Sequence, residues 1–171
     1  MSTTPQDFDL DAWLDGADRP QRSVTVYQKA GLIADLDALA ERIELAEAEE
    51  EVDGPSMGGG AQKLRAEYAA LAQQFHDSAL TVRVQGHSDD ERDELRSANP
   101  KLGGGEMGRL ILADALVSPK FTAEQVARFE KVIGPAQFAA VLGAYRRACS
   151  EVPVVSADFL PKSSTLGDGR E

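Results

Sequence analysis

The residues that could do chemistry in this chain are few. A glycine-rich string at Gly103-Gly104-Gly105-Glu106-Met107-Gly108 matches the G-x-G-x-x-G pattern of dinucleotide-binding turns. Such a turn needs a strand before it and a helix N-terminus aimed at a pyrophosphate. Here Asn99-Pro100-Lys101-Leu102 precedes the string, and Glu106 brings a negative charge to its mouth. We therefore expect a flexible linker into a helix. A second run, Gly58-Gly59-Gly60, lacks the Gly-Lys-Ser/Thr ending of a phosphate loop and is expected to form a turn.

Acidic residues near the start of the chain have the spacing of calcium ligands. They occupy offsets one, three, five, nine and twelve of a helix-loop-helix calcium loop: Asp7, Asp9, Asp11, Asp15 and Asp18. However, Ala12 stands where the loop needs glycine, and Asp18 is shorter than the usual bidentate glutamate. The segment is therefore expected to be a solvated, acidic helix start without a metal.

Histidine and cysteine are too sparse for a zinc site or a nucleophile with its base. His76, His87 and Cys149 are far apart in the sequence, and no His-x-x-x-His or Cys-x-x-Cys spacing occurs. Both histidines are expected at polar positions beside a strand, and Cys149 as a small buried residue. The glutamates of residues 41–51 fit a solvated helix exterior. We expect no catalytic residue, no cofactor and no metal, and hence no enzyme.

The composition and net charge of the chain exclude some classes of binding partner. The 171 residues are 42% hydrophobic and only 6% aromatic, and the net charge is −11. This charge repels phosphate backbones and anionic lipid, so nucleic acid and membranes are not expected partners. The single cysteine excludes an intrachain disulfide, and neither a signal peptide nor an apolar run of about 18 residues is recognisable. A cytoplasmic location is expected.

In the first half of the chain, the sequence predicts helices and strands that alternate. We expect a short helix from about Asp9 to Gly16, and a strand over residues 23–28, where β-branched residues alternate. Apolar residues at coiled-coil spacing then predict a helix from Leu32 to about Glu51. Its seam consists of Leu32, Leu36, Leu39, Ile43 and Ala46.

A helical hairpin is expected next, because a second seam follows a break at residues 53–60. That seam consists of Leu64, Tyr68, Leu71 and Phe75. Neither narrow stripe is stable in water unless it faces the other, so the two helices should be antiparallel. Residues 80–85 alternate again and should pair antiparallel with the first strand, to which the hairpin returns the chain.

The second half is expected to be helical. Capping-box spacing at Ser88–Glu91 predicts a helix that stops before Pro100, and another helix is expected from about Glu106 to Val117. A second capping box, Thr122–Gln125, should begin a helix that breaks at Gly134-Pro135.

The expected fold class is therefore α+β and predominantly α, with an antiparallel helical hairpin inserted between two paired β-strands and a C-terminal helical bundle after them. Four regions follow: residues 1–20 as an acidic segment with a short helix, 21–87 as strand, hairpin and strand, 88–150 as a helical region, and 151–171 as a loosely structured tail.

Several segments of the chain resemble a known protein family. The opening Asp9-Leu10-Asp11-Ala12-Trp13-Leu14-Asp15-Gly16-Ala17-Asp18-Arg19-Pro20-Gln21-Arg22-Ser23-Val24 resembles the start of tail assembly chaperones from siphophages of high-GC Gram-positive hosts. The resemblance continues at Leu80 to Val84, Ser118-Pro119, Thr122 to Val126 and Gln137-Phe138. The acidic linker and the Gly103 to Gly108 stretch depart from it.

This resemblance implies an assembly factor, absent from the mature virion, that works in the cytoplasm of the infected bacterial host. It would bind the tape measure protein, a very long helical chain, and keep it soluble while the tail tube assembles. Self-association and a longer product made by a programmed frameshift are also implied.

Exposed apolar stripes could serve such binding. The candidate partner-binding residues are Trp13, Phe129, Phe138, Leu142 and Tyr145. The competing interpretation is that these side chains form the protein's own core. Two other functions remain open, namely a structural virion component such as a head-tail joining protein and an acidic DNA mimic that inhibits a host protein.

Overall fold

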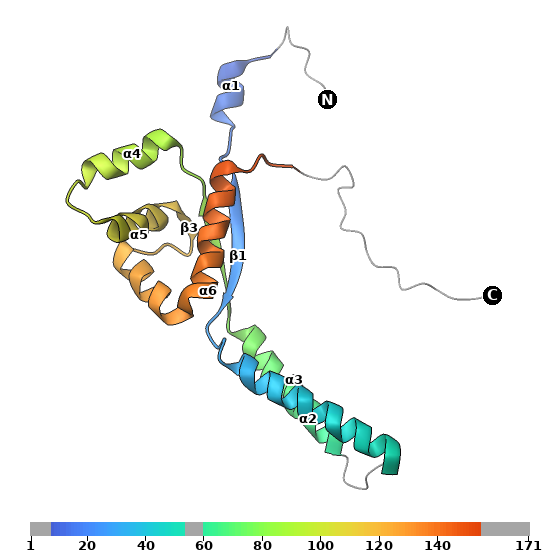
Figure 1. Cartoon of the computed structure of the whole chain (residues 1–171). Coiled ribbons are helices and arrows are strands. Elements are labelled where there is room, and N and C mark those ends of the chain that lie inside the picture. Colours follow the sequence, from blue (N-terminus) through green and yellow to red (C-terminus); the bar gives the residue numbers. More distant parts are fainter. Residues whose placement is uncertain (1–7, 54–59, 155–171) are drawn as a thin grey trace.

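The fold combines a small antiparallel sheet with helices, as the sequence predicts. The computed structural model describes residues 8–53 and 60–154 (Figure 1). Its elements are α1 (Leu10–Asp15), β1 (Gln21–Tyr27), α2 (Leu32–Asp53), α3 (Gly60–Asp77), β2 (Ala79–Gln85), α4 (Asp89–Ala98), α5 (Gly104–Ala115), β3 (Leu116–Ser118) and α6 (Ala123–Ser150). The α+β, predominantly α class is confirmed. The expected loose tail beyond residue 154 and the turn at 54–59 lie outside the described residues.

β1 and β2 form the centre of the fold and pair antiparallel, which confirms the predicted pairing. Their register runs from Gln21 opposite Gln85 to Tyr27 opposite Ala79 without a bulge. The ladder extends beyond both strand ends, because Gly86 N donates to Pro20 O and Gln28 N donates to Ser78 O. The chain between the strands forms the helical hairpin.

A third strand, β3, is the main difference from the expected fold. We predicted helix as far as Val117, but α5 ends at Ala115 and Leu116–Ser118 pair antiparallel with β2. Proline disfavours helical geometry in the residue before it, and Pro119 follows Ser118. Leu116 is almost fully buried in the core, so burial favours the extended conformation that pairs it with Val84. The sheet order is therefore β1-β2-β3.

The core lies between one face of the sheet and the helices α5 and α6. It consists of Val26, Val82, Val84, Leu112, Leu116, Val126, Phe138, Val141 and Ala144. The opposite face of the sheet is polar and exposed, with Ser23, Thr25, Thr81 and Arg83 on it. This alternation is expected for an antiparallel sheet that is covered on one face only.

The hairpin α2/α3 projects from one end of the sheet, whereas α1 lies at the other end (Figure 1). Leu36, Leu39 and Ala61 are its buried apolar side chains among the described residues. At its base the rings of Tyr27 and Phe75 stack with centroids 4.2 Å apart, which ties the hairpin to β1. His76 also lies edge-on to both rings, so aromatic contacts reinforce the apolar contact between the two helices of the hairpin.

Helix boundaries in the second half follow the predicted caps. Ser88 with Glu91, and Thr122 with Gln125, form capping boxes at the starts of α4 and α6. The predicted break inside α6 is confirmed at Gly134, whose φ of 80° suits glycine and interrupts the helix before Pro135. The second half of α6 then runs over the sheet as a separate straight segment.

Glu91 should contribute stability that acid removes. A hydrogen bond from Ser88 N, and then its pairing with Arg19, lower the pKa of the Glu91 carboxyl to about 2 from an ordinary 4.5. Because the folded-state pKa is the lower one, this stability is complete above pH 4.5 and is lost as the pH falls through 2. Glu91→Gln keeps a cap acceptor but removes the charge. We expect it to cost at most about 1 kcal/mol at pH 7 and nearly nothing at pH 2, by urea unfolding.

Glu94→Gln, on the same helix and exposed to solvent, is the matched control and should differ little from the parent at either pH. An equal effect of Glu91→Gln at pH 7 and pH 2 would contradict the assignment.

Candidate functional site

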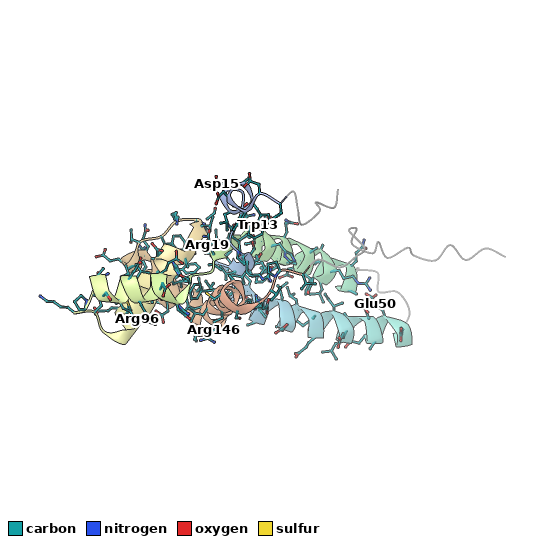
Figure 2. All side chains as sticks on the ribbon, turned by 90° about the horizontal axis from the view of Figure 1, so that it is seen from above. Trp13, Asp15, Arg19, Glu50, Arg96 and Arg146 are labelled. Carbon is teal, nitrogen blue, oxygen red and sulfur yellow. The ribbon has the colours of Figure 1, made fainter. Side chains whose placement is uncertain are left out.

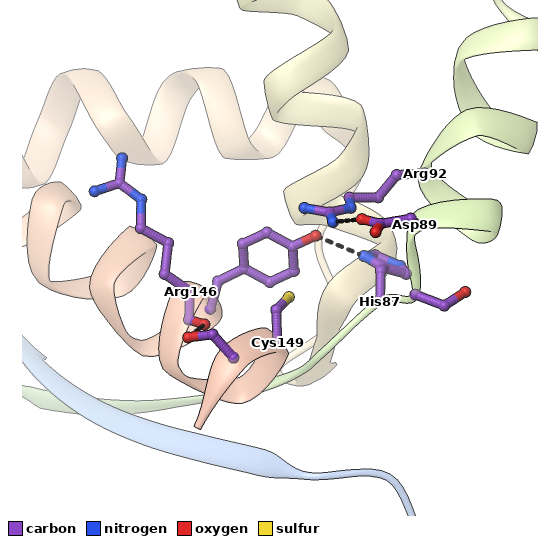
Figure 3. Close-up of a pocket in the computed structure, with 8 residues that line it drawn as sticks. His87, Asp89, Arg92, Arg146 and Cys149 are labelled. Atoms are coloured by element: carbon purple, nitrogen blue, oxygen red, sulfur yellow. Dashed lines mark hydrogen bonds and ion pairs between the residues drawn. The ribbon is translucent and has the colours of Figure 1, made fainter. Parts of the chain in front are cut away.

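A polar pocket of about 480 Å³ lies between the start of α4 and the end of α6. His87, Asp89 and Arg92 line it from the α4 side, and Tyr145 and Cys149 from α6 (Figure 3). The capping box at Ser88 fixes where α4 begins and thereby places Asp89 and Arg92 at the pocket. This pocket therefore brings together several side chains that can exchange protons or form hydrogen bonds.

His87 is held on both sides of its ring. Its Nδ1 lies 2.9 Å from the Tyr145 hydroxyl, and its Nε2 lies 2.8 Å from Asp114 Oδ2. The side chain is only 6% exposed. The partners of the two ring nitrogens are therefore Tyr145 and Asp114, and the hydrogen bonds of the described residues do not join His87 to Cys149. The three side chains instead join the end of β2 to α5 and α6. The sequence predicted a polar position for His87 but offered no signal for these partners, which lie 27 and 58 residues away.

Two other charged groups of the pocket, Asp89 and Arg92, neutralise each other, and Arg146 adds a further positive charge to its lining. Arg92 pairs with Asp89, and this hydrogen bond raises the pKa of the Arg92 guanidinium. Burial, followed by a hydrogen bond to the Cys149 thiol, raises the pKa of the Tyr145 phenol, which stays protonated at neutral pH. Cys149 itself is half-buried. The Tyr145 hydroxyl, the His87 ring and the Asp114 carboxylate thus form a continuous hydrogen-bonded chain at this pocket.

The glycine string has a different role from the one predicted. Gly103 caps α5 and the helix begins at Gly104, so most of the string is helix and not linker. The preceding residues come from α4 and a turn, whereas a dinucleotide loop follows a strand. Gly103 N donates to Glu106 Oε2 at 3.1 Å, which places a carboxylate at the helix mouth. A phosphate there would meet like charge.

The acidic start of the chain behaves as a helix cap where it is described. Asp9 Oδ1 accepts a hydrogen bond from Ala12 N and caps α1, which ends at Gly16 as predicted. Asp7 lies outside the described residues. Within residues 8–53 and 60–154 no three His, Cys, Asp or Glu side chains gather closely enough to hold a metal ion.

Four of the five candidate partner-binding residues lie in or against the protein's own core, and the fifth, Trp13, lies apart from them. Phe138 is 8% exposed and belongs to the core, and Phe129, Leu142 and Tyr145 are half-buried against that core. Trp13 is 59% exposed on α1. Figure 2 shows Trp13 and Asp15 at the margin of the molecule, far from the labelled Arg96. A binding role of the five stays a prediction, and of them Trp13 is the one with an exposed apolar side chain.

Trp13 has apolar neighbours that the sequence analysis did not place among the candidates. Phe8, Leu10 and Leu14 are each at least half exposed. The rings of Phe8 and Trp13 lie 6.4 Å apart between centroids. We call these four residues the α1 patch. The helical spacing of Leu10, Trp13 and Leu14 was the available signal, and large exposed apolar groups gathered in one place are typical of binding surfaces.

A second exposed apolar set lies on the hairpin, and its setting is acidic. Ile33 and Leu45 of α2 and Tyr68 of α3 are exposed. Arg42 is the only basic residue of α2, which otherwise carries a long series of aspartates and glutamates. Among them, Glu47 pairs with Arg65 and Glu50 accepts a hydrogen bond from Ala61 N, so part of this charge holds the two helices together.

No described protein family, curated protein or solved structure matches this chain. Among the helices of the described residues, none is both long and apolar enough to cross a bilayer.

Proposed function

We propose that this protein is a phage tail assembly chaperone that binds the tape measure protein and keeps it soluble while the tail tube is assembled. The observation that carries the proposal is the α1 patch, Phe8, Leu10, Trp13 and Leu14, which is exposed to solvent. Three of its residues, Leu10, Trp13 and Leu14, lie in the stretch, Asp9 to Val24, that resembles the siphophage family. The proposed place of action is the cytoplasm of the infected host, and the mature virion should lack this protein.

Physical properties of the chain suit this role. A long unassembled helical protein exposes apolar stripes that aggregate, so its chaperone needs apolar contact groups and enough charge to keep the complex in solution. The α1 patch contains apolar side chains that could contact the partner, including a tryptophan, a residue type that often contributes strongly to binding. The net charge of −11 would keep the complex in solution, because molecules of like charge repel one another. The function we propose is therefore binding without catalysis.

Co-expression with the tape measure protein of the same phage tests the proposal. We expect a larger soluble fraction of the tape measure protein and a complex that affinity capture recovers. Trp13→Ala should weaken capture at least about tenfold, because truncation of a central tryptophan removes a large share of binding energy. Val132→Ala, which shortens an equally exposed apolar side chain on α6, is the matched control and should bind normally.

Each outcome has a distinct meaning. If the tape measure protein stays insoluble and no complex is recovered, the chaperone proposal fails. If the complex forms and Trp13→Ala binds as well as Val132→Ala, the chaperone proposal stands and the α1 patch is the wrong surface. Abundant peptides of this chain in purified virions, found by mass spectrometry, would favour a structural virion component instead.

A further inference from the structure

Within the part of the chain that the structure describes, no strand pairs with the outer edge of β1. β1 is the first strand in the sheet order and pairs with β2 on one side only. In an antiparallel pair every second residue of a strand directs its N–H and C=O groups toward the partner strand. Pro20 and Gln28 are hydrogen-bonded to residues opposite them at the ends of β2, so residues 22, 24 and 26 between them also direct their backbone groups toward β2. Gln21, Ser23, Thr25 and Tyr27 therefore direct their N–H and C=O groups outward.

Gln137 of α6 already occupies one end of this edge. Its Oε1 accepts from Tyr27 N at 2.7 Å, and its Nε2 donates to Tyr27 O at 3.1 Å. The side-chain amide thus takes the place that a neighbouring strand would have at Tyr27. Gln21, Ser23 and Thr25 remain as the open part of the edge, and their side chains are exposed on the polar face of the sheet.

The open part carries none of the usual protection against pairing. Natural edge strands are blunted by proline, lysine, bulges or very short length. β1 has seven residues, its register with β2 has no bulge, and its sequence from Gln21 to Tyr27 holds neither proline nor lysine. Two of the nearby arginines are compensated within the chain, because Arg19 pairs with Glu91 and Arg22 with Glu151. Arg83, which lies opposite Ser23 and is exposed, forms no ion pair with another described residue, but it belongs to β2 and lies one strand away from the edge.

We propose that the occupant of this edge is β1 of a second copy, so that two chains form a continuous six-stranded antiparallel sheet around a two-fold axis. An antiparallel pair of identical strands centred on Ser23 brings Gln21 opposite Thr25 and Ser23 opposite its equivalent. All three open residues of each copy then form hydrogen-bonded pairs. A pair centred one residue further along would need Tyr27, which Gln137 blocks. The side-chain amide thus selects the register.

Self-complementarity is what favours a second copy over a foreign strand. The side chains that meet across the axis are serine with serine and glutamine with threonine, which can hydrogen-bond and carry no charge. The flank of α6 near Gln137 also leaves room. Gln137 and the Glu151 partner of Arg22 place the second half of α6 along β1. Its first turns expose the small residues Ala136, Ala139 and Ala140, whereas its last turns expose Arg146 and Arg147.

The inference goes beyond the proposed function and is tested on the purified full-length chain alone. Sedimentation velocity over a range of concentrations should show a monomer–dimer equilibrium. Ser23→Pro removes the outward N–H, which the monomer does not use, and so eliminates two hydrogen bonds across the axis. We expect dimer formation to weaken at least about tenfold. Ser23→Ala keeps the N–H and is the matched control, with dimer formation unchanged.

Cross-linking tests the register independently of proline's effect on folding. Ser23→Cys in a Cys149→Ser background should form a covalent dimer on oxidation, because Cα atoms of a hydrogen-bonded pair lie about 5.5 Å apart and a disulfide spans that distance. Thr81→Cys, on the same exposed face of the central strand β2, should stay monomeric. A parent chain that is monomeric at its highest soluble concentration, or equal cross-linking at the two positions, would overturn the proposal.

Discussion

Replacing Phe138 by alanine should lower the free energy of unfolding by about 3–5 kcal/mol. The ring is 8% exposed and packs in the core with Val26, Val141 and Leu112. The substitution removes the hydrophobic transfer energy of the ring and leaves a cavity in the core beside α6, which a close-packed core fills only in part. Urea unfolding followed by circular dichroism measures the change.

Trp13→Ala is the matched control for this prediction, because Trp13 is also aromatic but 59% exposed. We expect its free energy of unfolding to stay within about 0.5 kcal/mol of the parent. The pair of variants therefore separates the two interpretations of the aromatic residues, since Phe138→Ala should impair folding and Trp13→Ala should impair binding. A stable Phe138→Ala variant that fails to bind the tape measure protein would reverse the assignment.

Gly86→Ala should destabilise the fold by about 3 kcal/mol, the upper part of the range for overpacked sites. A Cβ at this position would lie 2.4 Å from Ala148 O and 2.7 Å from Ala148 C. Both are backbone atoms of α6, so they cannot move aside as a flexible side chain would. The helix must shift away from the end of β2, and the contacts of His87 with Tyr145 and of Val84 with the core would change with it.

The comparison with Gly108→Ala controls for the general effect of replacing glycine. Gly108 lies inside α5, and a Cβ there would meet no heavy atom within 4 Å outside the adjoining residues and backbone of its own helix. Alanine is the better helix former, so this variant should gain about 0.5–1 kcal/mol. Thermal unfolding of the two variants should therefore shift in opposite directions. Equal shifts would show that the close approach of β2 to α6 is not what Gly86 permits.

The two proposals can also be combined. In the dimer proposed here, the antiparallel arrangement of β1 would place the α1 patch of one copy on the same side as the hairpin of the other. Both ends of the dimer would then present apolar residues from α1 and from α2. A tape measure protein, as a long helical chain, could contact both ends. Ser23→Pro in the co-expression experiment would show whether the dimer is required for solubilisation.

The sequence by itself determined the elements that depend on short-range patterns. The seams at three- and four-residue spacing, the capping boxes at Ser88 and Thr122 and the break at Gly134 each involve residues within one or two helical turns, so they are readable in a single chain. The pairing of β1 with β2 was also predictable, because the hairpin between them returns the chain to its starting point. Together these patterns sufficed for the fold class.

Only the tertiary structure decided which apolar and polar residues are available to a partner. Phe138 and Trp13 are both aromatic residues in helices, yet one is in the core and the other is exposed. Likewise, the partners of His87 and the amide that covers Tyr27 come from distant elements. The physical reason is that burial and hydrogen-bond satisfaction are properties of the packed whole, whereas periodicity and capping are properties of neighbouring residues.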